Sequence, residues 1–134
     1  MAGIGGAMTA VREVMSTELV IVDPSVIVTE AARVMSTHRA GSVLVLDEGS
    51  LVGIFTERDI LRALAHYAKA DEARVSPVSR WMTPGPVTIG PDATSGEALD
   101  VMLSGGFRHL PVLEGDNLVG IVSMRDLARS ISKG

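Results

Sequence analysis

The apolar residues of the first half of the chain alternate between short runs and a helical stripe. Residues 19–22 form a β-branched run that closes at Pro24, which predicts a buried strand. In the segment 26–37 the apolar residues then recur at i, i+3, i+4 and i+7, which predicts a helix with one apolar face. These apolar positions are Val28, Ala31, Ala32 and Met35.

The next two apolar runs predict a hairpin followed by a second helix. Residues 43–46 and 51–55 flank a short polar loop that contains Gly49, as expected for two antiparallel strands. Thr56 then begins a helix whose apolar face consists of Ile60, Leu61, Leu64 and Ala68. With a short helical lead-in at 11–15, the order is strand, helix, strand, strand, helix, and the predicted fold class is α+β.

The same order comes a second time, 67 residues further on. Residues 53–59 read GIFTERD, and residues 120–126 read GIVSMRD. The same offset joins Met15 to Met82, Pro24 to Pro91, Ala31 to Ala98, Met35 to Met102 and Leu51 to Leu118. The chain is therefore divided into a tail at 1–10, repeat 1 at 11–67, a polar linker at 68–75 and repeat 2 at 76–134.

Repeat 2 predicts its elements at matching places. A strand is expected at 86–89, a hairpin at 110–113 and 118–122, and a last helix at 124–132. Thr94 and Glu97 have the spacing of a capping box, whereas repeat 1 has Ile27 in place of the hydroxyl. The paired methionines and Trp81 are interpreted as core or interface residues.

Each copy of the repeated motif has a hydroxyl residue followed three positions later by an aspartate. Thr56 with Asp59 and Ser123 with Asp126 have the spacing of a helix N-terminal capping box. The same groups, with backbone donors and a positive dipole end, also suit the ribose and phosphate of a nucleotide. The spacing alone leaves both readings open.

Composition narrows the function classes. With 134 residues and 46% hydrophobic content the chain can form one core, but each half would be marginal alone, so the repeats are expected to pack on each other. A net charge of −4 without basic runs disfavours a nucleic-acid partner. The lack of cysteine excludes disulfides and thiol catalysis.

The sequence predicts a cytoplasmic protein with no membrane partner. No apolar run approaches the roughly 18 residues of a membrane span. The first seven residues have neither the basic region nor the apolar region of a signal peptide. His38 and His66 lack partners at metal-ligand spacing, so no metal site is predicted.

The duplicated order resembles a pair of cystathionine β-synthase (CBS) domains, a Bateman module. The resemblance rests on the order, spacing and duplication of short motifs over nearly all of 11–132. In repeat 1 the motifs are 14–16, 21–24, Glu30-Ala31, 51–54 and 56–59; in repeat 2 they are 81–84, Glu97-Ala98, 107–112 and 123–126.

The resemblance implies two repeats packed sheet to sheet about a pseudo-twofold axis, with two clefts that bind adenosyl ligands. The ligands implied are AMP, ADP, ATP, NAD(H) or S-adenosylmethionine, with no cofactor required. Asp59 and Asp126 would accept hydrogen bonds from ribose hydroxyls, and Thr56 and Ser123 would hold ribose or phosphate. The remaining implied contacts are Arg39, Arg108 and His109 for phosphate, and Val20, Gly41 and Thr88 around the adenine.

For other charged residues near the motifs, the sequence does not decide between a ligand contact and an exposed surface position. Arg58 and Arg125 fit solvated helix surfaces as well as ligand contacts. Glu57 stands where Met124 stands in repeat 2, and a carboxylate at that point would repel a phosphate. The site that uses Asp126 is therefore the expected better one.

Three functions remain to compare. The favoured one is a regulatory module that senses an adenosyl ligand, forms a homodimer and signals to an effector protein that the sequence does not name. An enzyme finds no support, because no nucleophile has a histidine partner and no catalytic residue stands out. The alternative is a ligand-free dimerisation scaffold.

Overall fold

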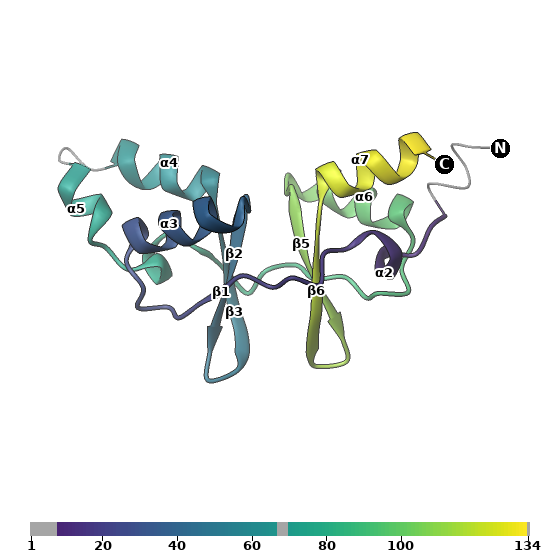
Figure 1. The fold of residues 1–134 in the computed structure, drawn as a ribbon, viewed down its shortest axis with the longest axis horizontal. Helices are drawn as coiled ribbons and strands as arrows, with labels where there is room; N and C mark the ends of the chain where they lie inside the picture. The colour runs from purple at the N-terminus through teal and green to yellow at the C-terminus, as the bar shows by residue number, and fades with distance from the viewer. Residues whose placement is uncertain (1–7, 67–69, 134) are drawn as a thin grey trace. The chain divides into compact units, whose positions relative to one another are not determined.

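The computed structural model describes residues 8–66 and 70–133 and divides the chain into two compact units. The central unit is Val20–Pro86, and the terminal unit combines Met1–Leu19 with Val87–Gly134. Both units contain helices and strands, so the predicted α+β class is confirmed (Figure 1).

A four-stranded sheet forms the base of the central unit. Strand β1 (Ile21–Val22) runs parallel to β2 (Ser42–Asp47), β2 pairs antiparallel with β3 (Ser50–Thr56), and β3 pairs antiparallel with β4 (Thr83–Pro84). The turn between β2 and β3 has positive φ at Glu48 (50°) and Gly49 (82°), as a tight two-residue hairpin requires. The helices of this unit are α3 (Val28–His38), α4 (Glu57–His66), α5 (Ala70–Arg74) and the 3-10 helix η1 (Val78–Arg80).

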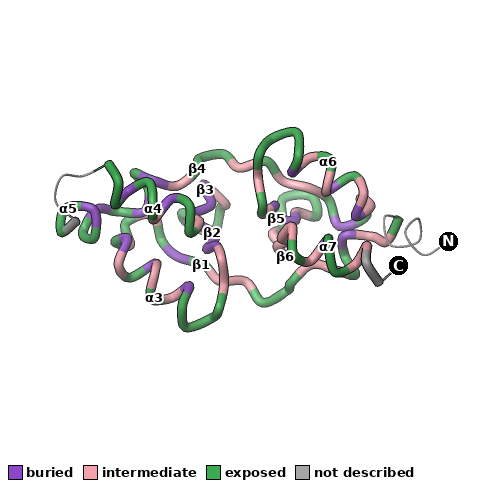
Figure 2. Tube along the Cα trace, turned by 90° about the horizontal axis from the view of Figure 1, so that it is seen from above, coloured by how far each residue is buried: buried purple, intermediate pink, exposed green. Residues whose placement is uncertain are grey.

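The helical stripe of α3 forms one side of the core of the central unit. Val28, Ala31 and Met35 are buried, as the periodicity predicted, and they join Phe55 in one hydrophobic cluster. Buried and exposed positions alternate along α3 (Figure 2). Trp81 belongs to the same cluster, and its indole N–H donates to Ser76 Oγ at 3.0 Å. The interpretation of Trp81 as a core residue is confirmed.

The terminal unit has a two-stranded antiparallel sheet, β5 (His109–Glu114) and β6 (Asn117–Ser123). Its core contains the fully buried Val11, Ala98 and Met102, with Met15 packed against them. Figure 1 shows α6 and α7 along the same side of this hairpin. The helices of the unit are α2 (Val11–Val14), α6 (Ser95–Gly105) and α7 (Met124–Lys133).

The first strand of each repeat is shorter than predicted. The run 19–22 pairs only at Ile21–Val22, and the strand expected at 86–89 is reduced to one parallel bridge between Ile89 and Val112. Ile89 donates its N–H to the Pro111 carbonyl and accepts from Leu113 N–H, both at 3.0 Å. Pro86 has no N–H to offer, so pairing cannot extend back to it.

The region predicted as a polar linker is partly helical. Residues 70–74 form α5, and Ala73 is fully buried in the core of the central unit. The charged residues of this segment led to the prediction of a linker. Ala73, which lies among them, instead packs against the core of the central unit. Residues 67–69 lie outside the described residues.

The segment that leads into each repeat pairs with the hairpin of the other repeat. Residues 83–84 form β4 on β3, and Ser16 bridges Ile121 of β6 by two backbone hydrogen bonds of 2.8 and 3.0 Å. Ser16 and Thr83 stand 67 residues apart, so the two exchanges are equivalent. The compact units consequently divide at 19/20 and 86/87, whereas the repeats of the sequence divide within 67–76.

Two glycines make these exchanges possible. A Cβ on Gly53 would lie 2.3 Å from Met82 Sδ, and a Cβ on Gly120 would lie 2.5 Å from Met15 Sδ. Both distances are far shorter than a van der Waals contact. The methionine of each lead-in therefore packs directly on the bare backbone of a hairpin glycine, which explains why these four residues repeat together.

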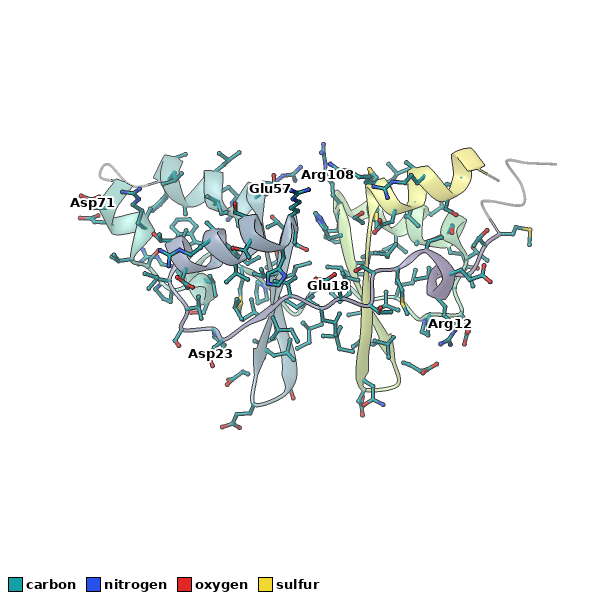
Figure 3. The ribbon with its side chains drawn as sticks, viewed as in Figure 1. Arg12, Glu18, Asp23, Glu57, Asp71 and Arg108 are labelled. Carbon is teal, nitrogen blue, oxygen red and sulfur yellow. The ribbon has the colours of Figure 1, made fainter. Side chains whose placement is uncertain are left out.

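An ion-pair cluster also holds the N-terminal lead-in on the terminal unit. Arg12 on α2 (Figure 3) lies with Nη2 3.1 Å from Asp92 Oδ1 and 2.9 Å from Glu114 Oε2. The hydrogen bonds to Glu114 and Asp92 raise the pKa of Arg12. The pairs are solvent-exposed, so they orient α2 more than they stabilise it.

Replacing Thr94 by alanine should lower the free energy of unfolding by about 1 kcal/mol. Thr94 Oγ1 accepts a hydrogen bond from Glu97 N–H at 3.1 Å, which is the predicted N-cap of α6. Ile27 at the start of α3 makes no such bond. Urea denaturation followed by circular dichroism measures the effect. Thr17→Ala, at an exposed position, is the control, and equal stability of the two variants would contradict the cap.

Candidate functional site

The first candidate site lies where β3 ends and α4 begins. The Asp59 carboxylate folds back over the start of the helix: its Oδ2 accepts from Thr56 N–H at 2.9 Å and from Thr56 Oγ1–H at 3.2 Å. The Asp59 side chain is only 5% exposed. The carboxylate half of the predicted capping box is present, while the threonine hydroxyl donates to the aspartate.

The second candidate site, between β6 and α7, has both halves of the capping box. Asp126 Oδ2 accepts from Ser123 N–H at 2.9 Å, and Ser123 Oγ accepts from Asp126 N–H at 3.1 Å. Asp126 is partly exposed, in contrast to Asp59. Among the described residues Asp126 Oδ1 has no hydrogen-bond or ion-pair partner, so this carboxylate can still accept from a ligand.

Backbone hydrogen bonds hold the start of each helix next to the residue that precedes the first strand of the hairpin. Glu57 N–H donates to the Gly41 carbonyl at 3.2 Å, and Met124 N–H donates to the Arg108 carbonyl at 2.8 Å. In the strand register Thr56 lies opposite Ser42, and Ser123 lies opposite His109. Gly41 therefore lies beside the first candidate site, and Arg108 and His109 lie beside the second, while their ligand contacts stay predictions.

The other predicted contacts lie at the edges of these sites. The Val20 carbonyl accepts from Leu44 N–H at 2.8 Å, which fixes Val20 beside β2. Thr88 immediately precedes Ile89, the residue that bridges to β5. Arg39 ends α3 in the left-handed region, with φ 53°, where repeat 2 has Gly106 at φ 74°. The ligand contacts of these three residues stay predictions.

Four arginines that are close to the two candidate sites in the sequence have no carboxylate partner among the described residues. Arg39, Arg58, Arg108 and Arg125 are exposed and form no ion pair within residues 8–66 and 70–133. Figure 3 shows Arg108 at the start of the β5 hairpin and Glu57 at the start of α4. Free cations near a helix N-terminus favour an anionic ligand, and Glu57 opposes it in the first site.

One residue of the first site was missed by the sequence reasoning. Arg62 Nη1 lies 2.8 Å from Asp59 Oδ1, so the carboxylate is engaged on both oxygens. The available signal was the i, i+3 spacing of the two residues on α4, which brings side chains together on a helix. The spacing alone does not distinguish an arginine that pairs with the aspartate from one that faces solvent.

Among the described residues, no three histidine, aspartate or glutamate side chains lie close enough together to hold a metal ion. Within the same ranges no helix has both the length and the apolar character needed to cross a membrane.

The fold and the repeated sites match a known family. The family model for the CBS domain matches residues 11–66 and 78–133, which is most of the chain. The protein therefore belongs to the CBS domain family and contains two such domains in tandem, as the resemblance indicated. An uncharacterized 17.7 kDa protein of Acidianus ambivalens is 42% identical over 125 residues, which cover 92% of this chain and 73% of that protein.

Solved structures of CBS-domain proteins share the fold. The CBS-domain containing protein ATU1752 of Agrobacterium tumefaciens is 34% identical with a TM-score of 0.86, covering 93% of this chain and 95% of that one. CBSX2 in complex with AMP is 25% identical with a TM-score of 0.77, covering 91% and 95%. The CBS domain pair of MJ0100, in complex with 5′-methylthioadenosine and S-adenosyl-L-methionine, is 26% identical with a TM-score of 0.83, covering 93% and 97%.

Proposed function

We propose that this protein is a regulatory module that binds an adenosyl ligand through the start of α7. The observation that carries the proposal is the state of Asp126: one carboxylate oxygen caps the helix, and the other is open. A vicinal diol donates two hydrogen bonds, and a carboxylate is a strong acceptor for both. The bound AMP of CBSX2 and the S-adenosylmethionine and methylthioadenosine of MJ0100 support this class of ligand.

Each neighbouring group then has a role in the proposed site. The Ser123 N–H group holds the Asp126 carboxylate in place at the N-terminus of α7 through a hydrogen bond. Arg108 is tied to the helix start through its carbonyl, so its exposed guanidinium is available for a phosphate or carboxylate of the ligand. The positive end of the helix dipole favours the same negative charge. Ser123 and Asp126 can therefore cap the helix and contribute to the ligand site at the same time.

We propose that ligand binding changes the conformation of a homodimer, and that an effector protein binds one of the two conformations. A ligand shifts an equilibrium between two conformations only by the difference in its affinity for them. We propose a homodimer of this chain as the responding species, and an adenosyl pool of the cytoplasm as the signal. The effector is expected to bind this protein with an affinity that depends on the adenosyl ligand.

Asp126→Asn should abolish the rise in melting temperature that AMP, ADP, ATP, NADH or S-adenosylmethionine produces in the natural protein. Ligand at about one hundred times its Kd adds roughly 2.7 kcal/mol, or several degrees for a domain of this size. Asparagine keeps the shape of aspartate and an oxygen for Ser123 N–H, but it removes the charge. Thermal melting of both proteins with each compound is the measurement.

Asp100→Ala, an exposed aspartate of α6, is the matched control and should keep the shift. A folded protein that responds to none of the five compounds would contradict ligand sensing. The scaffold alternative, in which Ser123 and Asp126 only cap a helix, would then be supported.

A further inference from the structure

The aspartates of the two repeats are equivalent in sequence but differ in their surroundings. Asp59 is tied by Arg62, with Nη1 2.8 Å from Oδ1, and its side chain is 5% exposed. The Arg62 side chain is 57% exposed, so the guanidinium end of the pair faces solvent. Arg129 occupies the equivalent position in repeat 2, and the described residues show no ion pair between it and Asp126.

The acceptor capacity of each carboxylate follows from these contacts. A carboxylate offers about four lone-pair positions. Asp59 uses three of them, for Thr56 N–H, Thr56 Oγ1–H and Arg62 Nη1–H, which leaves about one. Asp126 uses one, for Ser123 N–H, which leaves about three. A ribose diol needs two, so Asp126 can accept both hydroxyls and Asp59 cannot unless Arg62 leaves.

We infer that Arg62 is a specificity-determining residue that keeps Asp59 from binding a ribose diol, so that the module binds one adenosyl ligand through repeat 2. This inference rests on the proposed function and deepens it. The ligand would have to displace a charge-assisted hydrogen bond from a buried carboxylate before it could bind at Asp59. A change of one helix-surface residue would then switch the number of sites from one to two.

The test uses full-length variants titrated with AMP and with adenosine by isothermal titration calorimetry. Asp126→Asn should lose binding, and adding Arg62→Gln should restore it at Asp59, at least about tenfold tighter than in Asp126→Asn alone. Adenosine isolates the diol because it has no phosphate for Arg62 to contact. A further change, Asp59→Asn, should abolish the restored binding.

The matched control is Arg129→Gln in the Asp126→Asn protein, which should restore nothing. Circular dichroism melting confirms that each variant is folded; if the glutamine variant is not, Arg62→Lys, which lacks the planar guanidinium, should restore binding more weakly. Binding that stays absent in folded Asp126→Asn/Arg62→Gln, or that persists through Asp59 in Asp126→Asn alone, would overturn the role of Arg62. Absence of binding by the natural protein would instead remove the proposed function itself.

Discussion

Replacing Phe55 by alanine should lower the free energy of unfolding of the central unit by about 3–5 kcal/mol. Phe55 is fully buried on β3, opposite Val43, in the cluster that also contains Trp81. The substitution removes the largest of the side chains that are fully buried in the described residues, and it leaves a cavity that the neighbouring side chains fill only in part. Because the chain has one tryptophan, urea denaturation followed by its fluorescence reports on this unit.

Leu61→Ala on α4 provides the control for this prediction. Leu61 is 68% exposed, so its removal should change the free energy of unfolding by no more than about 0.5 kcal/mol. A loss of less than about 1 kcal/mol for Phe55→Ala would mean that Phe55 is not a core residue of a packed unit.

Gly120→Ala should lower the free energy of unfolding of the terminal unit by about 1–3 kcal/mol. The added Cβ would lie 2.5 Å from Met15 Sδ and 3.0 Å from the Ser16 carbonyl oxygen. The methionine can rotate, but Ser16 is held by its two backbone hydrogen bonds to Ile121, so the lead-in itself must move. Urea denaturation followed by circular dichroism measures the loss.

Gly90→Ala is the matched control, since a Cβ there meets no atom within 4 Å. A double-mutant cycle with Met15→Ala then tests the cause of the loss. If the Met15 side chain is in the way, the combined loss should be smaller than the sum of the two single losses. Strict additivity would assign the effect of Gly120→Ala to the backbone alone.

Much of the fold could be predicted because the repeat supplied most local signals twice. The i, i+3, i+4, i+7 stripe of α3 correctly predicted Val28, Ala31 and Met35 as core residues. Local spacing also located the caps, because Thr94 and Glu97 interact within a single turn of helix. These interactions depend on neighbours a few residues away, which a sequence displays directly.

The exchanged lead-ins could not be predicted in the same way. The pairing of Ser16 with Ile121 spans more than one hundred residues, and nothing in the composition of either segment names its partner. The conserved spacing of Met15 to Met82 and of Gly53 to Gly120 showed duplication, but it is compatible with packing inside each repeat. The backbone pairing of each lead-in and the close approach of its methionine to a glycine assign the partners in three dimensions.

The sequence predicted where the two aspartates lie, but not which side chains pair with them. The positions of Asp59 and Asp126 after strand ends follow from the repeated motif, and the structure places them there. The sequence shows an arginine three residues after each aspartate. Of these two aspartates, Asp59 is the one with an ion pair among the described residues, and the spacing does not encode that side-chain orientation.

The exchange of lead-ins has a consequence for the origin of the chain. Each repeat contains a lead-in methionine and a hairpin glycine, but in this chain each methionine covers the glycine of the other repeat. If a polypeptide with one repeat kept this contact, its methionine would cover the glycine of a second copy, and the two chains would exchange their N-terminal segments. Fusion of two genes for such a polypeptide converts the exchange into one within a single chain, where it no longer depends on protein concentration.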